Sequence, residues 1–427
     1  MNTIKLFKKN SVNSEIEVVS DKSITHRAVI FASLSSGQCE IKNFLQSADC
    51  FSTINAFRNL GVVIDQNESN LKVYGVGING LLPPKSDIDA GNSGTTARLI
   101  CGVLASQNFK SKIIGDKSLS KRPMKRVIEP LRAMGANISA VEDNFLPMEI
   151  NGNPNLKPIR WNSKISSAQV KSCILLAAMF TNGIVEYREP VLSRDHTERL
   201  MKYLKLPIEI KSNKIVFEGK VKQISPFEVI VPGDPSSASY FIATAILVPG
   251  SKLYLKNVCI NPTRMGFIDT LIKMGAKIVF QNERIAYNEP VADILVESSK
   301  LRSIKLNKDD IPSMIDEIPL LAVVATQADG VTEIRGAKEL RVKESDRIKT
   351  ITSQLSEMGA KVVEQEDGMI IIGGTKLRPA EVESFDDHRI AMSLAVASSI
   401  VDGETIIKNP ECVSISFPNF WELFKSI

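Results

Sequence analysis

The stretch LIKMGAKIVFQNERIAYNE (Leu271–Glu289) carries the pattern that decides the fold. Its amphipathic first part ends in Met-Gly-Ala, and a glycine is well suited to the C-terminal end of a helix. The run KIVF that follows is typical of a strand, and a second β-rich run comes after it. The stretch therefore predicts a helix followed by a pair of strands.

The same pattern recurs along the whole chain. Its successive copies are marked by Gly61, Gly135, Leu206, Gly275 and Gly359, which lie roughly 70–85 residues apart, a period typical of stacked units. The Leu206 copy, YLKLPIEIKSNKIVFEG, is weaker because it lacks the glycine. Each copy is preceded by another helix, a polar turn and a strand, so each unit is predicted to be β-α-β-α-β-β. A sixth copy, SFPNFWELFKSI, ends the chain as a helix.

Six units in 427 residues predict two similar α/β domains of three repeats each. The sixth unit lacks its last strands, and the N-terminal segments NTIKLFKK and SEIEVV are expected to supply them. One domain would then be discontinuous, comprising residues 1–20 and 233–427, with residues 21–232 inserted as the other. The chain would cross twice at a hinge, near Ser20 and near Pro232-Gly233. A plain tandem split near residue 230 is the alternative.

The composition is that of an ordinary soluble globular protein. The hydrophobic residues make up 43%, the charged residues 24%, and the net charge is +5. Acidic residues accompany the basic ones almost everywhere, which argues against nucleic acid as a partner. Six scattered cysteines, with no signal peptide and no membrane-length apolar run, indicate a cytoplasmic protein with no membrane association.

Short polar clusters stand at the predicted helix starts. A helix N-terminus presents unpaired N–H groups and a partial positive charge, so it attracts anions. Several such ends together with basic side chains would form a site for phosphorylated or carboxylated small molecules. The clusters are SDKSITHR (from Ser20), DAGNSGTTAR (from Asp89), SSAQVKS (from Ser166), DPSSASY (from Asp234), PSMIDE (from Pro312) and DDHR (from Asp386).

Each cluster also has a purely structural interpretation. KSITHR fits a capped surface helix in which Ser23 caps the helix or donates to an anion. AGNSGTTAR fits a tight strand–helix turn, and it lacks the spacing of a nucleotide P-loop. The basic run GDKSLSKRPMKR (Gly115–Arg126) fits a solvated face, with Pro123 in the first turn of a helix that orients Arg122.

Two clusters place carboxylates beside cations. In RVKESDR (Arg341–Arg347), Lys343 and Arg347 are predicted to share a helix face, and a like-charged pair there favours an anion between them. Glu344 beside them is a candidate proton carrier, although an ordinary ion-paired face is the alternative. Asp316, in an otherwise apolar stretch, is a further candidate, with a helix N-cap as the alternative. The three histidines lack metal-ligand spacing, so no metal site is predicted.

Taken together and in order, KSITHR, GNSGTTAR, KRPM, SSAQVK, RVKESDR and DDHRIAM closely resemble the 5-enolpyruvylshikimate-3-phosphate synthase family over the whole chain. GDKS, SAQVK, RDHTE and NPTR look like the class II form, some of whose members tolerate glyphosate. The resemblance implies the enolpyruvyl transferase fold, with three inverted β-α-β-α-β-β repeats in each domain. It also implies a monomer that uses no metal and no organic cofactor.

The implied reaction transfers the enolpyruvyl group of phosphoenolpyruvate to the 5-hydroxyl of shikimate 3-phosphate. A tetrahedral intermediate forms and then loses phosphate, on the shikimate pathway to chorismate and the aromatic amino acids. Two unit charges about 5 Å apart repel by roughly 3 kcal/mol at an effective dielectric near 20, and these multiply charged substrates repel more strongly. We therefore expect the basic groups to meet in one crevice between the domains, which would close on the first substrate.

The resemblance implies a role for each matching residue. Lys22 should touch both substrates, Asp316 should take the 5-hydroxyl proton, and Glu344 with Lys343 should manage protonation of the methylene carbon. The shikimate 3-phosphate contacts should be Lys22, Ser23, Arg27, Ser167, Ala168, Gln169, Arg194, Asp316 and Lys343. The phosphoenolpyruvate contacts should be Lys22, Asn92, Gly94, Arg122, Gln169, Arg347 and Arg389.

One position departs from the family pattern. Ile415 stands where some relatives place a lysine that reaches phosphoenolpyruvate, so either another cation substitutes or one contact is lost. The class II motifs favour glyphosate tolerance, but Gly94 leaves space that an alanine would close.

Three other functions were weighed. UDP-N-acetylglucosamine enolpyruvyl transferase, which shares fold and donor, uses a cysteine in the loop that matches Gly115–Arg126, and none stands there. A non-catalytic phosphometabolite-binding protein would not need Asp316 and Glu344. A nucleic-acid binder working through RPMKR would need interleaved aromatic residues, which this run lacks.

Overall fold

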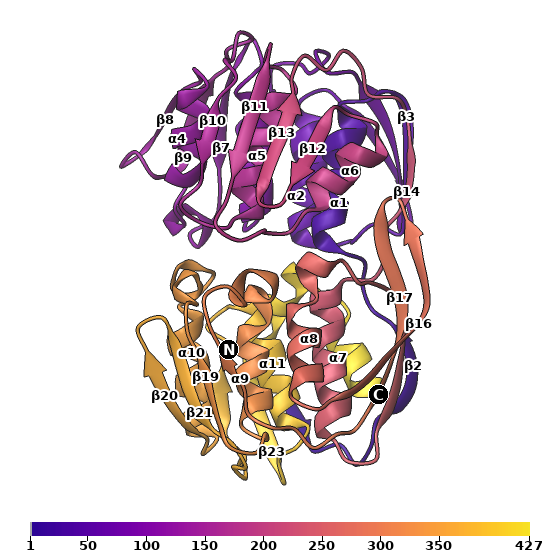
Figure 1. The fold of residues 1–427 in the computed structure, drawn as a ribbon, viewed down its shortest axis with the longest axis vertical. Helices are drawn as coiled ribbons and strands as arrows, with labels where there is room; N and C mark the ends of the chain where they lie inside the picture. The colour runs from indigo at the N-terminus through magenta and orange to yellow at the C-terminus, as the bar shows by residue number, and fades with distance from the viewer. Residues whose placement is uncertain (1) are drawn as a thin grey trace. The chain divides into compact units, whose positions relative to one another are not determined.

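The computed structural model describes residues 2–427 and divides the chain into two compact units (Figure 1). Unit 1 comprises the chain up to Val19 with residues 232–285 and 290–427, and unit 2 comprises residues 20–231 and 286–289. Residues 286–289 are the turn of a hairpin whose strands otherwise belong to unit 1. The sequence pattern gives no sign that this turn belongs with unit 2.

One repeat of unit 2 shows the architecture that recurs. A lead strand is followed by a helix, a second strand, a second helix and a hairpin. In the sheet the lead strand pairs in parallel with the second strand, and the hairpin adds two antiparallel strands in the order β6-β7-β9-β8. The elements are β6 (Ile88–Asp89), α3 (Gly94–Leu104), β7 (Lys110–Ile114), α4 (Lys125–Ala133), β8 (Asn137–Val141) and β9 (Phe145–Asn151).

The other repeats follow the same order, which confirms the predicted fold class. Unit 2 adds α1 (Lys22–Ser33), β3 (Ser36–Lys42), α2 (Ala48–Asn59), β4 (Val63–Asn67), β5 (Asn70–Val76), β10 (Arg160–Asn162), α5 (Ala168–Ala178), β11 (Ile184–Arg188), α6 (His196–Tyr203), β12 (Ile208–Lys211) and β13 (Lys214–Glu218). Unit 1 contains α7 (Pro235–Leu247), β15 (Lys252–Cys259), α8 (Gly266–Lys273), β16 (Lys277–Ala286), β17 (Glu289–Glu297), β18 (Lys305–Leu306), α9 (Ile318–Ala325), β19 (Val331–Ile334), α10 (Arg347–Glu357), β20 (Lys361–Gln365), β21 (Gly368–Ile372), β22 (Glu381–Glu383), α11 (His388–Ser398), β23 (Glu404–Lys408) and α12 (Phe420–Ser426).

The first repeat of each unit takes its lead strand from elsewhere in the sequence. β2 (Asn13–Glu17) directly precedes α1, yet it pairs in parallel with β15 of unit 1. β14 (Glu228–Ile230) directly precedes α7, yet it pairs in parallel with β3 of unit 2. The exchange explains why the chain passes between the units twice.

The N-terminal strands therefore divide between two sheets. β1 (Thr3–Phe7) pairs antiparallel with β23 and completes the sixth repeat, as the sequence analysis predicted. The same prediction was wrong for β2, which joins the fourth repeat instead. The fourth repeat needs a parallel lead strand because β14, the strand before α7, is already paired with β3 in unit 2.

The first helix of each repeat is buried and the second is amphipathic. Within α3 every residue except Thr95 is buried, and α3 contacts α1 and α5. In unit 1, α7, α9 and α11 contact one another and are buried almost throughout. Their apolar sequences leave the polar residues at the N-terminal ends as the main chemical groups of these helices. No helix among residues 2–427 is both long and apolar enough to cross a membrane.

The Met-Gly-Ala turns end the second helices as predicted. Gly275 has a φ of +104°, and its N–H bonds back to Ile272 O at 2.9 Å. In the weaker third copy, Lys205 takes this left-handed position with a φ of +57°, directly after the helix cap Leu204. The sequence analysis had marked Leu206, one residue too late, because no glycine shows the position.

Candidate active site

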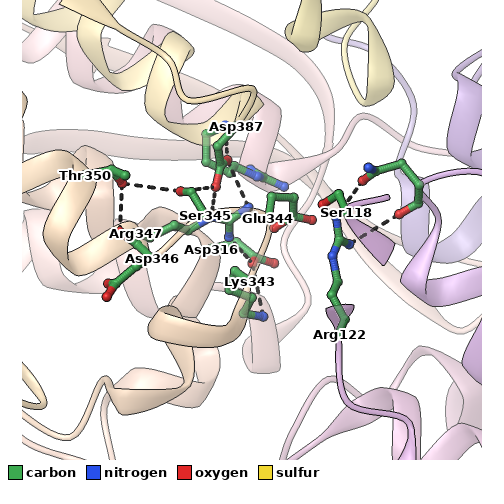
Figure 2. A network of polar contacts seen from close by, with 12 residues as sticks. Ser118, Arg122, Asp316, Lys343, Glu344, Ser345, Asp346, Arg347, Thr350 and Asp387 are labelled. Carbon is green, nitrogen blue, oxygen red and sulfur yellow. Dashed lines mark hydrogen bonds and ion pairs between the residues drawn. The ribbon is translucent and has the colours of Figure 1, made fainter. Parts of the chain in front are cut away.

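Unit 1 gathers four of the residues that the sequence singled out. Arg347, the first residue of α10, donates from Nη1 to Asp316 Oδ1 at 3.2 Å and from Nη2 to Glu344 Oε2 at 2.6 Å (Figure 2). Lys343 Nζ lies 3.7 Å from the same Asp316 oxygen. One guanidinium therefore ties together two carboxylates, and an ammonium stands beside one of them.

Asp387, the N-cap of α11, is a further member of this network that the sequence analysis did not assign. Its carboxylate accepts from Arg347 Nε at 2.8 Å and from Nη2 at 3.2 Å, and it also accepts from Ser345 Oγ at 3.0 Å. The signal was its place in DDHR, two residues before Arg389, where a buried carboxylate needs a cation. Asp387 fixes the plane of Arg347, and with it the positions of Asp316 and Glu344.

The local structure differs from the helix face predicted for RVKESDR. A 3₁₀ turn, η5, covers Lys338–Val342, and Lys343 follows it in an extended conformation, so the helix begins only at Arg347. Lys343 and Glu344 therefore precede the helix. Asp316 lies in the 3₁₀ turn η4 (Ile315–Glu317), and the N-cap of α9 is Glu317, so the N-cap interpretation of Asp316 is wrong.

Charge and burial shift the ionisation of this cluster. Burial lowers the pKa of Lys343 from its usual value, and Asp316 opposes that shift. For Arg347, burial acts to lower the pKa, but Asp387, Glu344 and Asp316 outweigh it and raise the pKa. Arg347 is thus a permanent cation, whereas the ammonium of Lys343 is a stronger acid than that of an exposed lysine.

Arg389 lies one residue into α11 and is buried. Its Nη1 is 3.8 Å from Glu317 Oε1, and Glu317 itself is only 2% exposed. Burial acts to lower the pKa of Arg389, but Tyr240, Asp316 and Glu317 together hold it well above its usual value. Glu317 was not singled out from the sequence, and it keeps Arg389 charged beside Asp316.

In unit 2, Lys22 and Arg27 both come from α1. Lys22 Nζ donates to Asp49 Oδ2 at 3.0 Å. Arg27, buried to 97%, donates to Ser23 O at 3.0 Å, to Thr197 Oγ1 at 2.6 Å and to Ser172 Oγ at 2.8 Å. The N-cap of α1 is Asp21, so Ser23 is not needed as a cap and its hydroxyl remains in the first turn.

The glycine-rich turn and the basic loop meet at Asn92. Arg122 Nη2 donates to Asn92 Oδ1 at 2.6 Å and to Ser118 Oγ at 3.0 Å (Figure 2). Asn92 Nδ2 donates in turn to Asp116 Oδ2 at 2.6 Å. Pro123 precedes the cap of α4, Met124, so it lies just outside the first turn in which the sequence analysis placed it.

Gly94 is the first residue of α3 and lies close to a second buried arginine. A Cβ built on Gly94 would lie 2.7 Å from Arg98 Nη1, so this position has little room for a side chain. Arg98 Nη1 donates to Gln169 Oε1 at 2.8 Å, and Gln169 Nε2 donates to Thr95 Oγ1 at 3.0 Å. Arg98 therefore links the start of α3 to the start of α5.

The remaining predicted residues stand around α5 and α6. Ser167 is the N-cap of α5, accepting from Val170 N at 3.4 Å, and Ala168 opens the helix. Arg194 lies in the loop before α6 and is near enough to Arg27 to lower its pKa.

Ile415, the position that departs from the family pattern, ends the 3₁₀ turn η6 (Pro410–Ile415) in unit 1 and brings no charge there. Within residues 2–427 no group of three or more His, Cys, Asp or Glu side chains is arranged to hold a metal ion.

Comparisons with known proteins agree on one family. The family model for EPSP synthase (3-phosphoshikimate 1-carboxyvinyltransferase) matches residues 6–424. The 3-phosphoshikimate 1-carboxyvinyltransferases of Endomicrobium trichonymphae and of Thermoanaerobacter sp. strain X514 are each 50% identical, covering 99% of this chain and 99% of their own.

Solved structures give the same result. EPSP synthase from Acinetobacter baumannii superposes with a TM-score of 0.88 at 40% identity, covering 99% of this chain and 98% of its own. The enolpyruvyl transferase NikO from Streptomyces tendae has a TM-score of 0.78 at 16% identity, covering 99% and 96%, and shows the shared fold alone. The chain therefore belongs to the EPSP synthase (3-phosphoshikimate 1-carboxyvinyltransferase) family.

Proposed function

We propose that this chain transfers the enolpyruvyl group of phosphoenolpyruvate to the 5-hydroxyl of shikimate 3-phosphate, with release of phosphate. Family membership supports the reaction. The observation that carries the proposal is the cluster in which Arg347 holds Asp316 and Glu344, with Lys343 beside Asp316. A protein that only bound anions would gain nothing from carboxylates in the same site, because they repel the ligand.

The proton transfers follow from this cluster. Asp316 accepts the 5-hydroxyl proton of shikimate 3-phosphate as that oxygen attacks C2 of phosphoenolpyruvate. Glu344 or Lys343 gives a proton to C3, which forms the tetrahedral intermediate. The same group then takes a proton back from the new methyl group as the C2–O bond to phosphate breaks. Lys343 suits both directions because burial lowers its pKa below that of an exposed lysine.

Binding of shikimate 3-phosphate is assigned mainly to unit 2. Arg27 is paired with hydroxyls and a carbonyl, so its positive charge remains available to a phosphate or carboxylate. The N-terminus of α5 adds N–H groups to the same set. The proposed contacts are Lys22, Ser23, Arg27, Ser167, Ala168, Gln169 and Arg194, with Asp316 and Lys343 from unit 1.

Phosphoenolpyruvate is assigned to residues of both units. Arg347 and Arg389 are cations of unit 1 whose charge is fixed by burial among carboxylates. Unit 2 would contribute Lys22, Arg122, Gln169 and the turn of Asn92 and Gly94. No cation stands at Ile415, so phosphoenolpyruvate would bind with one contact fewer than in relatives that have a lysine there.

The proposal also covers the cellular location and the oligomeric state of the protein. All six cysteines are buried free thiols, which suits a reducing compartment and supports a cytoplasmic location. We also propose that the enzyme acts as a monomer on its two small-molecule substrates. Size-exclusion chromatography with light scattering would detect a dimer and thereby contradict the monomer.

A phosphate-release assay tests the reaction directly. With both shikimate 3-phosphate and phosphoenolpyruvate present, phosphate should be released and the enolpyruvyl ether of shikimate 3-phosphate should accumulate in equal amounts. Omission of either substrate should abolish release. Release from phosphoenolpyruvate alone would indicate a phosphatase and contradict the transferase.

A further inference from the structure

A lysine whose side chain is fully buried lies in unit 2, and it is not among the residues assigned above to a substrate. Lys171 belongs to α5, and its side chain is 0% exposed. Its Nζ lies 2.9 Å from Glu189 Oε1, 2.9 Å from Ser193 O and 2.8 Å from Glu198 Oε1. Glu189 and Ser193 accept hydrogen bonds from this ammonium, and Glu198 forms an ion pair with it.

Lys171 remains charged in this position. Burial acts to lower its pKa, but the two carboxylates outweigh burial and the pKa is raised. Buried ion pairs are poor stabilisers, since well-packed apolar residues in their place are often neutral or more stabilising. Stability alone therefore gives no reason for three buried charges here.

The first consequence of this lysine is a fixed loop. Glu189 accepts from Ser193 N at 2.8 Å and from Ser193 Oγ at 2.8 Å, while Lys171 holds both residues. The loop is thus closed immediately before Arg194. Because Lys171 is anchored in α5, the backbone at Arg194 is tied to the helix that begins with Ser167 and Gln169.

The second consequence concerns Arg27. Ser172, the residue after Lys171, bonds to Thr197 Oγ1 at 2.6 Å, and Arg27 donates to both hydroxyls. Glu198, the residue after Thr197, pairs with Lys171. Burial lowers the pKa of Arg27 to about 10, and Glu198 is the leading charge that opposes this shift. Two consecutive residues of α5 thus hold two consecutive residues of α6 against Arg27.

We propose that Lys171 is a positioning residue for shikimate 3-phosphate, joining α5, the loop from Glu189 to Ser193 and α6 into one frame that sets Arg27 and Arg194. The inference rests on the proposed function. Lys171 touches neither substrate in this assignment. The phosphoenolpyruvate residues Asn92, Gly94 and Arg122 belong to the neighbouring repeat of the same unit, outside this frame. Gln169, which is assigned to both substrates, lies in α5, but its side chain is held by Arg98 of that neighbouring repeat and not by Lys171.

The test is a charge-neutral double variant, Lys171→Met with Glu189→Gln. Lys171→Met alone would leave two carboxylates buried without their cation and risks failure to fold. In the double variant, KM for shikimate 3-phosphate should rise about 100-fold, because small displacements of binding groups have effects of that size. KM for phosphoenolpyruvate, measured at saturating shikimate 3-phosphate, should stay near the wild-type value.

The matched control is Lys112→Met with Asp87→Asn. This variant removes a partly exposed ion pair of 2.9 Å in the same unit and should change neither KM. Glu189→Gln alone is a milder second variant that keeps Lys171 paired with Glu198, and it should raise KM for shikimate 3-phosphate in the same direction. It provides the same measurement if the double variant does not fold.

Three results would overturn the inference. KM for shikimate 3-phosphate could be unchanged in a folded variant, both KM values could rise together, or kcat alone could fall. The last two results would show that the pairing of Lys171 with Glu189 and Glu198 only supports the structure of unit 2. If the wild-type protein released no phosphate with both substrates, the proposed function itself would fail, which separates that failure from failure of the inference.

Discussion

Arg27 of unit 2 and Arg347 of unit 1 are both buried, but their surroundings are opposite. Arg27 donates to two hydroxyls and a carbonyl, and its pKa is lowered to about 10 chiefly by burial. Arg347 donates to three carboxylates, which raise its pKa. Arg27 therefore keeps a charge that can bind an anion, whereas Arg347 holds carboxylates in position for proton transfer.

The difference assigns separate tasks to the two regions. A buried cation among neutral partners is costly until an anionic ligand arrives, so part of the ligand's binding free energy offsets that cost. A buried cation among carboxylates is already neutralised and mainly fixes their geometry. Changes around Arg27 should therefore alter the binding of shikimate 3-phosphate, and changes around Arg347 should mainly alter turnover, stability and the binding of phosphoenolpyruvate.

The largest expected effect is a loss of turnover in the variant Asp316→Asn. The amide keeps the shape of the side chain but does not accept the 5-hydroxyl proton, so kcat should fall by about 10⁴-fold. Stopped-flow or steady-state phosphate release would measure it. Ser345→Ala, which removes one donor to Asp387 at the edge of the same network, is the control and should keep most activity. An Asp316→Asn enzyme with near wild-type kcat would remove Asp316 from the role of base.

The next effect is on stability, in Arg347→Met. The buried carboxylate of Asp387 and the partly exposed carboxylates of Asp316 and Glu344 would lose the cation that they share. This loss should lower the free energy of unfolding of unit 1 by about 3 kcal/mol. The chain has two tryptophans, Trp161 in unit 2 and Trp421 in unit 1. Urea unfolding followed by Trp421 fluorescence in a Trp161→Phe background would therefore report on unit 1 alone. A loss no larger than that caused by Arg27→Met would contradict the contrast.

The third effect is on binding, in Arg27→Met. Loss of a charged donor should raise the Kd for shikimate 3-phosphate about 100-fold, or ~2.7 kcal/mol. The free energy of unfolding of unit 2, followed by Trp161 with Trp421→Phe, should change little, since Ser172 and Thr197 still bond to each other. A large loss of stability without loss of affinity would mean that Arg27 is structural. Arg58→Met, at an exposed arginine on α2 that bonds to Ile64 O, is a control for affinity.

The smallest effect concerns protonation next to Arg27. Burial, then Lys22 and Arg27, lower the pKa of His26 well below its ordinary value of 6.5. The folded protein therefore binds fewer protons than the unfolded chain, so stability is complete above pH 6.5 and declines as the pH falls below it. The decline should be about 1 kcal/mol by pH 5.5.

Urea unfolding at pH 5.5 and pH 7.5 would measure this decline. In His26→Asn, which keeps a polar partner for Thr53, the difference between the two pH values should shrink by about 1 kcal/mol. An unchanged difference would show that His26 is not the group held neutral, and that the cationic surroundings of Arg27 do not extend to it.

Local sequence patterns predicted the repeats, but they did not predict which lead strand joins which repeat. The Met-Gly-Ala turns revealed the helix ends because a left-handed residue favours glycine, and Lys205 was misplaced by one residue where no glycine stands. The lead strand β2 could not be assigned, because a short alternating strand does not show which parallel neighbour it will join.

The residues of the candidate site, like the elements of the fold, could be predicted from the sequence only where the signal was local. Clusters at helix starts predicted which segments carry the cations, since capping residues and basic side chains are neighbours in sequence. The network around Arg347 could not be read in this way, because Asp387 is 40 residues away and Lys343 precedes the helix that was thought to carry it. Lys171 did leave a signal, as the one charge in the helix AQVKSCILLAA.

Calorimetric titration of shikimate 3-phosphate into the double variant Asp316→Asn with Glu344→Gln tests the separation of tasks most directly. Asp316 is itself a proposed contact of shikimate 3-phosphate, but its amide replacement keeps a hydrogen-bonding group at that position. The Kd should therefore stay close to that of the wild-type protein while phosphate release is lost, since Arg27 and its hydrogen-bond partners in unit 2 are untouched. Loss of binding in this variant, with Trp161 fluorescence showing that unit 2 is still folded, would contradict the assignment of shikimate 3-phosphate binding mainly to unit 2 and of proton transfer to unit 1.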